Sequence, residues 1–288
     1  MRFSEFKASD HARSPHLLLL GHPVSQSLSP LMHNTAADHH GFDLRYYAVD
    51  LQPDEFGNIA AHFNQDLFKG TNITVPYKEM LMDYVDEIEP SAGNIGAINT
   101  IYKRNGLLVG ANTDFYGFLK PLEPHEDDIT GMRAIVFGTG GASKAVVAGL
   151  FDVGMEEIVM VSRSPGRRGA SPNIESVRVV GYSEWTAYTD EAALVVNTTP
   201  LGMEPDTASS PVRDQEAEFL ADKICYDIVY KPERTRFLRI AERAGAKTIG
   251  GLDMLIYQGS ESFKLWTGKS FPINKVRHTL HEYLRKQH

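Results

Sequence analysis

The sequence of 288 residues contains a single cysteine, Cys225, and therefore no internal disulfide. A lone cysteine is typical of proteins in a reducing compartment and excludes a small disulfide-rich scaffold. Long apolar runs are also missing: the densest, Leu17 to Leu20, is far shorter than the roughly 20 residues of a membrane helix. The N-terminal segment lacks the apolar core of an export signal, so we expect a cytoplasmic protein that has no membrane partner.

Positive charge is scarce as well. Lys and Arg total 29 against 37 Asp and Glu, which gives a formal net charge of −8. The electrostatic field of a negatively charged protein repels phosphate groups, which argues against nucleic acid as the main partner. The contents of hydrophobic residues, 42%, and of charged residues, 23%, are ordinary for a globular protein, and the length favours two domains over one.

Strand-like and helix-like segments alternate along most of the chain, which predicts an α/β fold of sheets covered by helices. The expected strands are 16–21, 43–51, 67–75, a hairpin within 99–113, 133–138, 156–162, 193–198 and 223–230. The expected helices are 30–40, 53–63, 77–85, 143–154 and two in the C-terminal segment from 252, separated at Phe271-Pro272. Pro, Asp and Gly accumulate after Asp114, and we expect the domain junction there.

The strongest local signal is VFGTGGASKAV at 136–146, in which an apolar strand runs into three glycines before a helix. Glycines permit close backbone approach, and the free N–H groups of a helix start attract a pyrophosphate. The spacing departs from the common Gly-x-Gly-x-x-Gly fingerprint, and the alternative is a tight turn with no ligand. The residues of this predicted dinucleotide-binding loop are Gly138, Thr139, Gly140, Gly141 and Ala142.

The segment after the next strand indicates which dinucleotide binds. An NAD site usually carries an acidic residue there, which holds the ribose 2′-hydroxyl. Here the segment 162–168 is SRSPGRR, with three arginines and no acid. A guanidinium can hold a 2′-phosphate by paired, charge-assisted hydrogen bonds. NADP is therefore the predicted cofactor, and the alternative is a solvated loop that happens to be basic.

Four polar motifs in the first part of the chain lie at predicted strand ends, where open α/β sheets bind ligands. They are GHPVSQSLSPLMHN (21–34), GTNITVPYK (70–78), GAINT (96–100) and ANTD (111–114). Each alone has a structural explanation as a loop, a helix cap or a solvated lysine. Three further segments are NTTPLGM (197–203), DIVYKPERT (227–235) and GGLDMLIYQ (250–258). Taken in order, the seven motifs resemble the shikimate dehydrogenase family, from about residue 21 to the C-terminus.

The resemblance implies reversible, NADPH-dependent reduction of 3-dehydroshikimate to shikimate, a step of aromatic amino-acid biosynthesis. It implies that Lys78 and Asp114 are the catalytic pair and that the glycine loop holds the pyrophosphate. The residues that it implies for substrate binding are Ser27, Ser29, Thr74, Asn99, Tyr230 and Gln258. The residues that it implies for the adenosine 2′-phosphate are Ser162, Arg163, Ser164 and Arg167. The nicotinamide end would border Ile228 and Gly251.

The order of the motifs predicts the domain organisation. Gln258 follows the nucleotide-binding segments but matches a substrate-binding position, so we expect the chain to return to its first domain. The predicted substrate domain is 1–114 plus 253–288, and the predicted Rossmann-like NADP-binding domain is 115–252. We expect the active site in the cleft between them, which suggests hinge closure on ligand binding.

Two departures from the family pattern concern specificity. Gln26 stands where the family usually has histidine, and Ser162-Arg163-Ser164 stands where it usually has Asn-Arg-Thr. The second change keeps the arginine and short hydroxyls, whereas the first leaves open a quinate or aminoshikimate dehydrogenase of the same family. A catalytically idle ligand-binding regulator is the alternative from another class, and the presence of both Lys78 and Asp114 argues against it.

No metal is expected, because the 11 histidines show no metal-ligand spacing. A small polar ring with hydroxyls and a carboxylate calls instead for neutral side chains that both donate and accept hydrogen bonds. The oligomeric state is not readable from the sequence, and a homodimer is one alternative.

Overall fold

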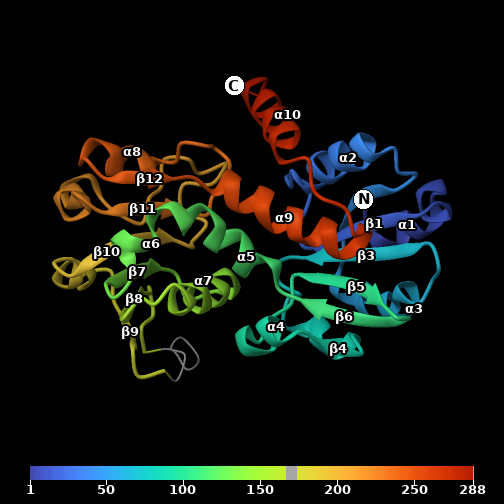
Figure 1. Ribbon diagram of the computed structural model, residues 1–288, viewed down its shortest axis with the longest axis horizontal. Helices are drawn as coiled ribbons and strands as arrows, with labels where there is room; N and C mark the ends of the chain where they lie inside the picture. The colour runs from blue at the N-terminus through green and yellow to red at the C-terminus, as the bar shows by residue number, and fades with distance from the viewer. Residues whose placement is uncertain (167–173, 288) are drawn as a thin grey trace. The chain divides into compact units, whose positions relative to one another are not determined.

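A computed structural model describes residues 1–166 and 174–287 of the chain. The polypeptide divides into two compact units, both drawn in Figure 1. Unit 1 comprises Met1–Thr113 and Ile256–His288, and unit 2 comprises Asp114–Leu255. Within the described residues each unit contains one six-stranded sheet flanked by helices, so the expected α/β fold class is confirmed. No helix in these ranges combines the length and the hydropathy that a membrane span requires.

The borders between the units fall inside two helices, α5 (Thr113–Leu119) and α9 (Gly251–Thr267). The chain therefore leaves unit 1 once and returns to it once. The binding roles predicted for 1–114 with 253–288, and for 115–252, stay predictions.

The sheet of unit 1 is mixed. Its strands are β1 (His16–Gly21), β2 (Arg45–Asp50), β3 (Phe68–Ile73), β4 (Glu87–Ile88), β5 (Thr100–Arg104) and β6 (Leu107–Ala111). They are ordered β2-β1-β3-β5-β6-β4, and β5 runs antiparallel to both of its neighbours. Asn105 and Gly106 form the turn of the predicted hairpin with φ values of 54° and 86°, the backbone that a two-residue Asn-Gly turn requires.

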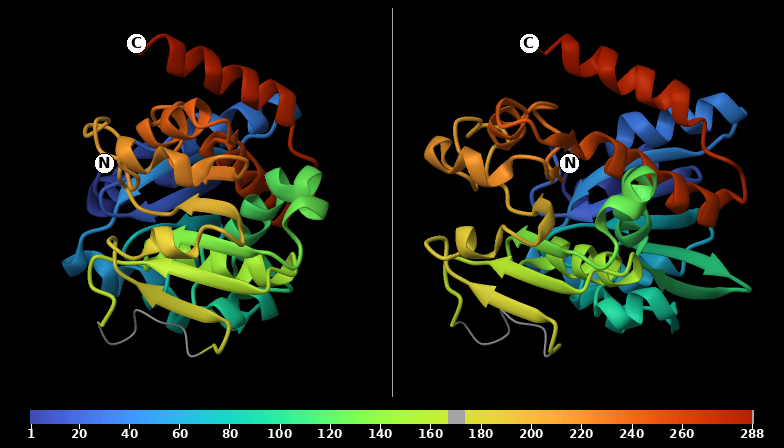
Figure 2. Two further views of the ribbon diagram at one scale, coloured as in Figure 1. Left: turned by 90° about the vertical axis from the view of Figure 1, so that its left-hand side faces the viewer. Right: turned by 60° about the vertical axis from the view of Figure 1, so that its left-hand side comes forward.

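Helices cover both faces of this sheet. They are α1 (Phe3–Ala8), α2 (Ser29–His40), α3 (Ile59–Phe63), α4 (Pro90–Ile95) and α10 (Ile273–Arg285), with the 3₁₀-helices η1 (Asp10–Arg13), η2 (Pro53–Asn58) and η3 (Met80–Tyr84). The C-terminal helix α10 packs beside α2 (Figure 2). The two C-terminal helices, α9 and α10, are separated at the predicted Phe271-Pro272 break.

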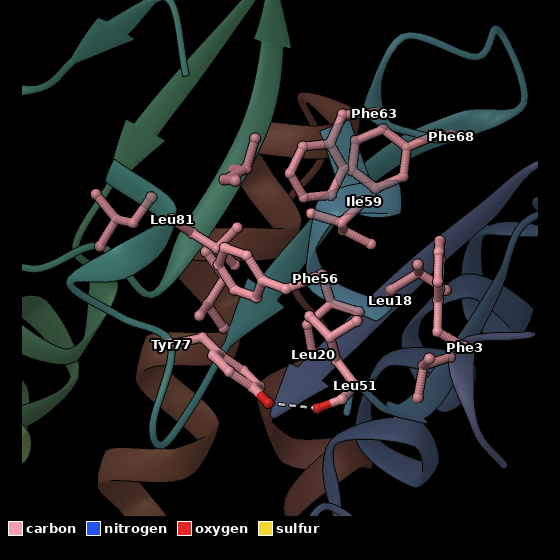
Figure 3. Close-up of a cluster of buried hydrophobic side chains, with 14 of the residues drawn as sticks. Phe3, Leu18, Leu20, Leu51, Phe56, Ile59, Phe63, Phe68, Tyr77 and Leu81 are labelled. Atoms are coloured by element: carbon pink, nitrogen blue, oxygen red, sulfur yellow. Dashed lines mark hydrogen bonds between the residues drawn. The ribbon is translucent and has the colours of Figure 1, made fainter. Parts of the chain in front are cut away.

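Strand β1 buries both of its faces, which explains why its sequence is a continuous run of leucines. Leu18 and Leu20 join the cluster around Phe3 that Figure 3 shows. Leu17 and Leu19 belong to a different cluster, on the opposite face of the sheet. Burial of each leucine side chain contributes roughly 1.5–3 kcal/mol to folding, so β1 is central to the stability of unit 1.

The predicted helix at 77–85 is wrong. Lys78 lies in a turn, and the segment that follows is the 3₁₀-helix η3. Tyr77 is buried in the hydrophobic core, where its hydroxyl donates to the carbonyl of Leu51 at 2.5 Å (Figure 3). The carbonyl of Lys78 accepts the backbone N–H of Ile98 instead of a helical partner. The tertiary contacts of this segment therefore override its helical pattern. The helix expected at 53–63 is likewise replaced by η2 followed by α3.

The sheet of unit 2 is entirely parallel in the described residues. Its strands are β7 (Arg133–Phe137), β8 (Glu157–Val161), β9 (Val177–Val180), β10 (Ala192–Asn197), β11 (Ile224–Asp227) and β12 (Lys247–Ile249). The order β12-β11-β10-β7-β8-β9 is that of a doubly wound, Rossmann-like domain. This confirms the predicted fold class, although the short strands β9 and β12 are absent from the sequence prediction.

The described helices of unit 2 lie on both faces of its sheet. They are α5, α6 (Glu126–Ile129), α7 (Gly141–Asp152) and α8 (Arg236–Arg243), with the 3₁₀-helices η4 (Lys120–His125), η5 (Trp185–Tyr188) and η6 (Asp214–Leu220). Alternate residues of β7 enter the two separate cores of the unit, Val136 on one face and Ile135 on the other. The Pro-rich segment after Asp114, expected as a junction, is mostly helical.

Candidate active site

Three of the four polar motifs from the first part of the chain meet at one edge of the sheet of unit 1. Because β5 is antiparallel to β3 and β6, its start lies at the same edge as their ends. Thr74 directly follows β3, Asn99 directly precedes β5, and the segment 112–114 directly follows β6. Residues from distant parts of the chain are thus collected where open sheets bind ligands.

The fourth motif begins at the same edge, after β1. A Cβ atom at Gly21, the last residue of β1, would lie 2.3 Å from Cγ2 of Thr74, so the two strand ends are in close contact. In the loop that follows, the hydroxyl of Ser27 donates to the hydroxyl of Ser29 at 3.1 Å and accepts the backbone N–H of Ser29 at 3.2 Å. This pair opens helix α2, with Ser29 as its first residue.

A backbone hydrogen bond fixes the position of Lys78. It lies in the turn between β3 and η3 and is partly buried. Its carbonyl accepts the N–H of Ile98 at 2.9 Å, and Ile98 directly precedes Asn99. The main chain at Lys78 is therefore attached to the segment that carries a predicted substrate-binding residue.

Asn99 and Gln258 are both buried in unit 1. The side-chain oxygen Oδ1 of Asn99 accepts the backbone N–H of Thr113 at 2.7 Å. Gln258 lies on α9. The residue after it, Gly259, packs closely against Met32 of α2, because a Cβ atom at 259 would lie 2.3 Å from Cε of Met32. Glycine at 259 thus allows the helix that carries Gln258 to approach the helix that begins at Ser29.

In unit 2, the predicted dinucleotide-binding loop lies at the topological switch point of the sheet, where β7 and β10 are neighbours. Gly138 has φ +110°, and a Cβ there would lie 2.6 Å from the hydroxyl of Thr198, which follows β10. Only glycine suits this position. Helix α7 begins at Gly141, so its first N–H groups and positive dipole end directly follow the loop.

The predicted 2′-phosphate segment follows β8. Ser162 is buried, and its hydroxyl accepts the backbone N–H of Ser164 at 3.2 Å. Arg163 is exposed. Arg167 and Arg168 lie outside the described residues.

The predicted nicotinamide residues lie together in unit 2. A Cβ at Gly251 would be only 2.3 Å from the carbonyl oxygen of Ile228, so a side chain at 251 would push the two segments apart. Tyr230, predicted to bind substrate, is partly buried and follows β11 by three residues.

A buried carboxylate anchors this strand end. Asp227 accepts the Thr235 hydroxyl at 2.6 Å, the Val229 N–H at 3.0 Å and the Asn197 side-chain amide at 3.0 Å. Burial raises the pKa of Asp227 to about 7, and the three donors oppose that rise. The hydrogen bonds fix the course of the chain from 227 to 235.

The described residues fit a dinucleotide phosphate at the loop after β7. They provide a glycine at which a side chain would be strained, an adjacent helix start and an exposed arginine after the next strand. Within the same ranges, no group of three or more His, Cys, Asp or Glu side chains is placed to hold a metal ion.

Comparison with known proteins gives a consistent result. A family model described as the shikimate dehydrogenase substrate binding domain matches residues 19–101, and one described as the shikimate 5′-dehydrogenase C-terminal domain matches 251–281. A relative from Moorella thermoacetica, named Shikimate dehydrogenase (NADP(+)), is 40% identical in an alignment of 272 residues, and the match covers 92% of this chain and 92% of the relative. The chain belongs to the shikimate dehydrogenase family.

Solved structures of the family have the same fold. Shikimate 5-dehydrogenase from Thermus thermophilus, in complex with NADP(H) and shikimate, is 35% identical with a TM-score of 0.81, and the match covers 93% of this chain and 98% of that one. The enzyme from Listeria monocytogenes, in complex with shikimate and NAD, is 29% identical with a TM-score of 0.84, over 93% and 96% of the two chains. The chain is therefore an oxidoreductase of this family.

Several groups that organise the candidate site are missing from the sequence prediction. Thr113 and Asp227 lie inside quoted motifs, but the motifs alone give no sign of what their side chains contact. Ser262 lies one helical turn after Gln258 and bonds to residues more than 140 positions earlier. A contact between residues so distant in the chain leaves no local pattern in the sequence.

Proposed function

We propose that this chain catalyses the reversible reduction of 3-dehydroshikimate to shikimate with NADPH as the reductant. The proposal depends most on one observation: a chain 40% identical to a relative named Shikimate dehydrogenase (NADP(+)), over 92% of its length, has a lysine, an asparagine and a threonine near one edge of a sheet. Unit 1 would supply most of the substrate-binding residues, and unit 2 would supply the cofactor-binding residues.

The chemistry requires a hydride at the carbonyl carbon and a proton at its oxygen. NADPH supplies the hydride when it is bound. The ammonium of Lys78 would stabilise the negative charge that develops on the oxygen and donate the proton, which converts the ketone to the alcohol. In the oxidation direction the neutral amine of Lys78 would take the hydroxyl proton. Asp114 would orient the lysine and the substrate hydroxyl.

The cofactor would be held by unit 2. Its pyrophosphate would lie over Gly138–Ala142 against the N-terminus of α7. Arg163 would pair with the 2′-phosphate that distinguishes NADP from NAD. Ile228 and Gly251 would border the nicotinamide.

The substrate would be held by neutral polar groups. The side chains that would bind its hydroxyls and carboxylate are those of Ser27, Ser29, Thr74, Asn99, Tyr230 and Gln258. A site built on such bonds rejects analogues that lack a hydroxyl, because its own buried polar groups would stay unpaired.

The test is a comparison of substrates and cofactors on the purified chain. Formation of NADPH is followed with shikimate and with quinate, and the oxidation of both is repeated with NAD⁺. We expect kcat/KM to be highest for shikimate with NADP⁺. Faster turnover of quinate would assign the chain to the alternative activity, and tight NADPH binding without turnover of either acid would favour a regulator.

A cytoplasmic location and a homodimer are further proposals. The single cysteine supports the first. Cell fractionation and analytical ultracentrifugation test them.

A further inference from the structure

Three buried hydroxyl groups meet beneath the sheet edge of unit 1. The hydroxyl oxygen of Ser262, on α9, lies 2.8 Å from that of Thr100 and 3.0 Å from that of Thr113, and the two threonine oxygens are 3.3 Å apart. All three residues are at most 2% exposed. We call this group the hydroxyl cluster. It joins the start of β5, the start of α5 and the middle of α9.

The backbone N–H of Thr113 and the hydroxyl cluster together orient the Asn99 amide. The Thr113 backbone N–H can only donate, and it points at the Asn99 side chain at 2.7 Å, so that atom must be the oxygen Oδ1. The same oxygen accepts the hydroxyls of Thr100 at 3.0 Å and Thr113 at 3.1 Å. The amide nitrogen Nδ2 donates to the Thr113 hydroxyl at 3.0 Å. Thr113 therefore contacts both ends of the Asn99 amide.

The amide keeps one donor for a ligand. Nδ2 has two N–H groups, and among the described residues Thr113 is the only acceptor that it reaches. The oxygen is turned towards the Thr113 N–H and the two threonine hydroxyls, so the group that Asn99 offers to the substrate edge is a hydrogen-bond donor. A substrate oxygen fits this donor.

The cluster also reaches the neighbouring predicted site residues. The Ser262 hydroxyl donates to the carbonyl of Gln258 at 3.1 Å. Asn72, two residues before Thr74, donates from its amide to Ser262 at 2.9 Å and to Thr100 at 3.0 Å. Buried polar networks that are fully bonded are rigid, and removal of one member leaves the others unpaired.

We propose that Thr113 is a positioning residue: its hydroxyl holds the Asn99 amide so that Nδ2 faces the substrate. This inference rests on the proposed function, because it takes Asn99 as a substrate-binding residue. Without the Thr113 hydroxyl, Nδ2 loses its acceptor, and the amide is no longer held at both ends.

The variants Thr113→Val and Thr113→Ser test the inference. Thr113→Val removes the hydroxyl at nearly constant volume, and we expect the KM for shikimate to rise about tenfold, the size typical of one buried hydrogen bond. The KM for NADP⁺ should stay unchanged, and Thr113→Ser should restore the shikimate KM. The matched control is Thr71→Val: Thr71 is fully buried in the same sheet, but among the described residues its hydroxyl bonds to backbone carbonyls alone. A loss of stability without a KM effect is expected there.

A measurement on the protein without substrate or cofactor distinguishes a failure of this inference from a failure of the proposed function. Hydrogen exchange of the Asn99 side-chain amide, assigned by its absence in Asn99→Asp, should be at least about tenfold faster in Thr113→Val. If the unmodified chain does not turn over shikimate but exchange is faster in Thr113→Val, the proposed function is refuted and the positioning role is supported. Unchanged exchange and an unchanged shikimate KM would overturn the inference. If Thr113→Val does not fold, Ser262→Ala carries the same two measurements, with an expected KM rise of about threefold.

Discussion

The backbone N–H of Ile98 donates to the carbonyl of Lys78 at 2.9 Å. This bond holds a lysine that lies in a turn, outside any helix, against the segment that leads into β5. The next residue, Asn99, donates its own N–H to the carbonyl of Ala111 at 3.0 Å, and its carbonyl accepts the N–H of Ile73 at 2.8 Å. Lys78 and Asn99 are therefore positioned by one continuous set of main-chain bonds.

Lys78→Met should lower kcat far more than it changes the KM for shikimate. The variant keeps the main-chain bonds and much of the side-chain volume but removes the group that transfers the proton. General acid–base catalysis typically contributes about 10²- to 10⁴-fold, and we expect a loss of kcat in that range. Lys69→Met, at an exposed position on β3, is the control and should leave kcat unchanged. Normal turnover in Lys78→Met would remove this residue from the mechanism.

Arg163→Ala should weaken the preference for NADP over NAD. The guanidinium is exposed after β8, and hydrogen bonds between charged groups are strong enough for a rise of about 10- to 100-fold in the KM for NADPH. The KM for NADH should not change, because NADH lacks the 2′-phosphate. Arg178→Ala, an exposed arginine on β9, should affect neither. Equal affinity for both cofactors in the unmodified chain would contradict the assignment of Arg163.

Asp227→Ala should destabilise unit 2. The substitution leaves the hydroxyl of Thr235 and the N–H of Val229 without their acceptor, and the Asn197 amide keeps only the Leu201 carbonyl of its two acceptors. Each buried unpaired group costs about 1–3 kcal/mol, so a loss of about 3 kcal/mol or more is expected in urea unfolding. The exposed Asp190→Ala should change stability by less than about 0.5 kcal/mol. Similar unfolding midpoints for the two variants would show that Asp227 does not anchor the strand end.

The N-terminal segment covers a buried pair of histidines. The Nε2 atoms of His16 and His62 are 2.9 Å apart, and both residues are at most 1% exposed. The rings of Phe3 and Phe6, from α1, meet that of His62 edge-on. Burial lowers the pKa of His16 and lowers the pKa of His62 to about 4, with further lowering of the latter by neighbouring positive charge.

The stabilisation that the two neutral histidines provide should therefore be lost between pH 6.5 and pH 4. The folded state holds these histidines neutral, whereas the unfolded chain takes up protons near pH 6.5, so their contribution is complete above that pH and is lost as the pH falls towards 4. The free energy of unfolding from urea titrations at several pH values measures this loss. His62→Phe should flatten the pH dependence, and the exposed His39→Ala should not. A His62 that titrates near pH 6.5 by NMR would contradict the account.

Local patterns predicted the regular parts of the fold. The run HLLLLG is strand β1 at its expected bounds, Asn105-Gly106 makes its turn, and the glycine loop joins β7 to α7. These features depend on residues close together in the sequence. The segment at 77–85 was not predictable in this way, because the burial of Tyr77 and the bond from Ile98 decide its conformation.

In the candidate site, too, local sequence patterns predicted some features, whereas others depend on contacts between distant residues. Motif matches selected residues such as Asn99 and Gln258, whose binding roles stay predictions until ligand binding is measured. The side chains that hold them were not found, because Ser262 is an ordinary serine on a helix until the fold brings it to Thr100 and Thr113. Likewise the N-terminal residues carry no motif, and only the structure shows Phe3 and Phe6 buried in the core.

A crystal structure of the enzyme with shikimate and NADP⁺ tests the central claim most directly. We expect Nζ of Lys78 within about 3.2 Å of the hydroxyl that becomes the ketone. A well-ordered complex in which Lys78 points into bulk solvent, out of reach of that oxygen, would contradict the account.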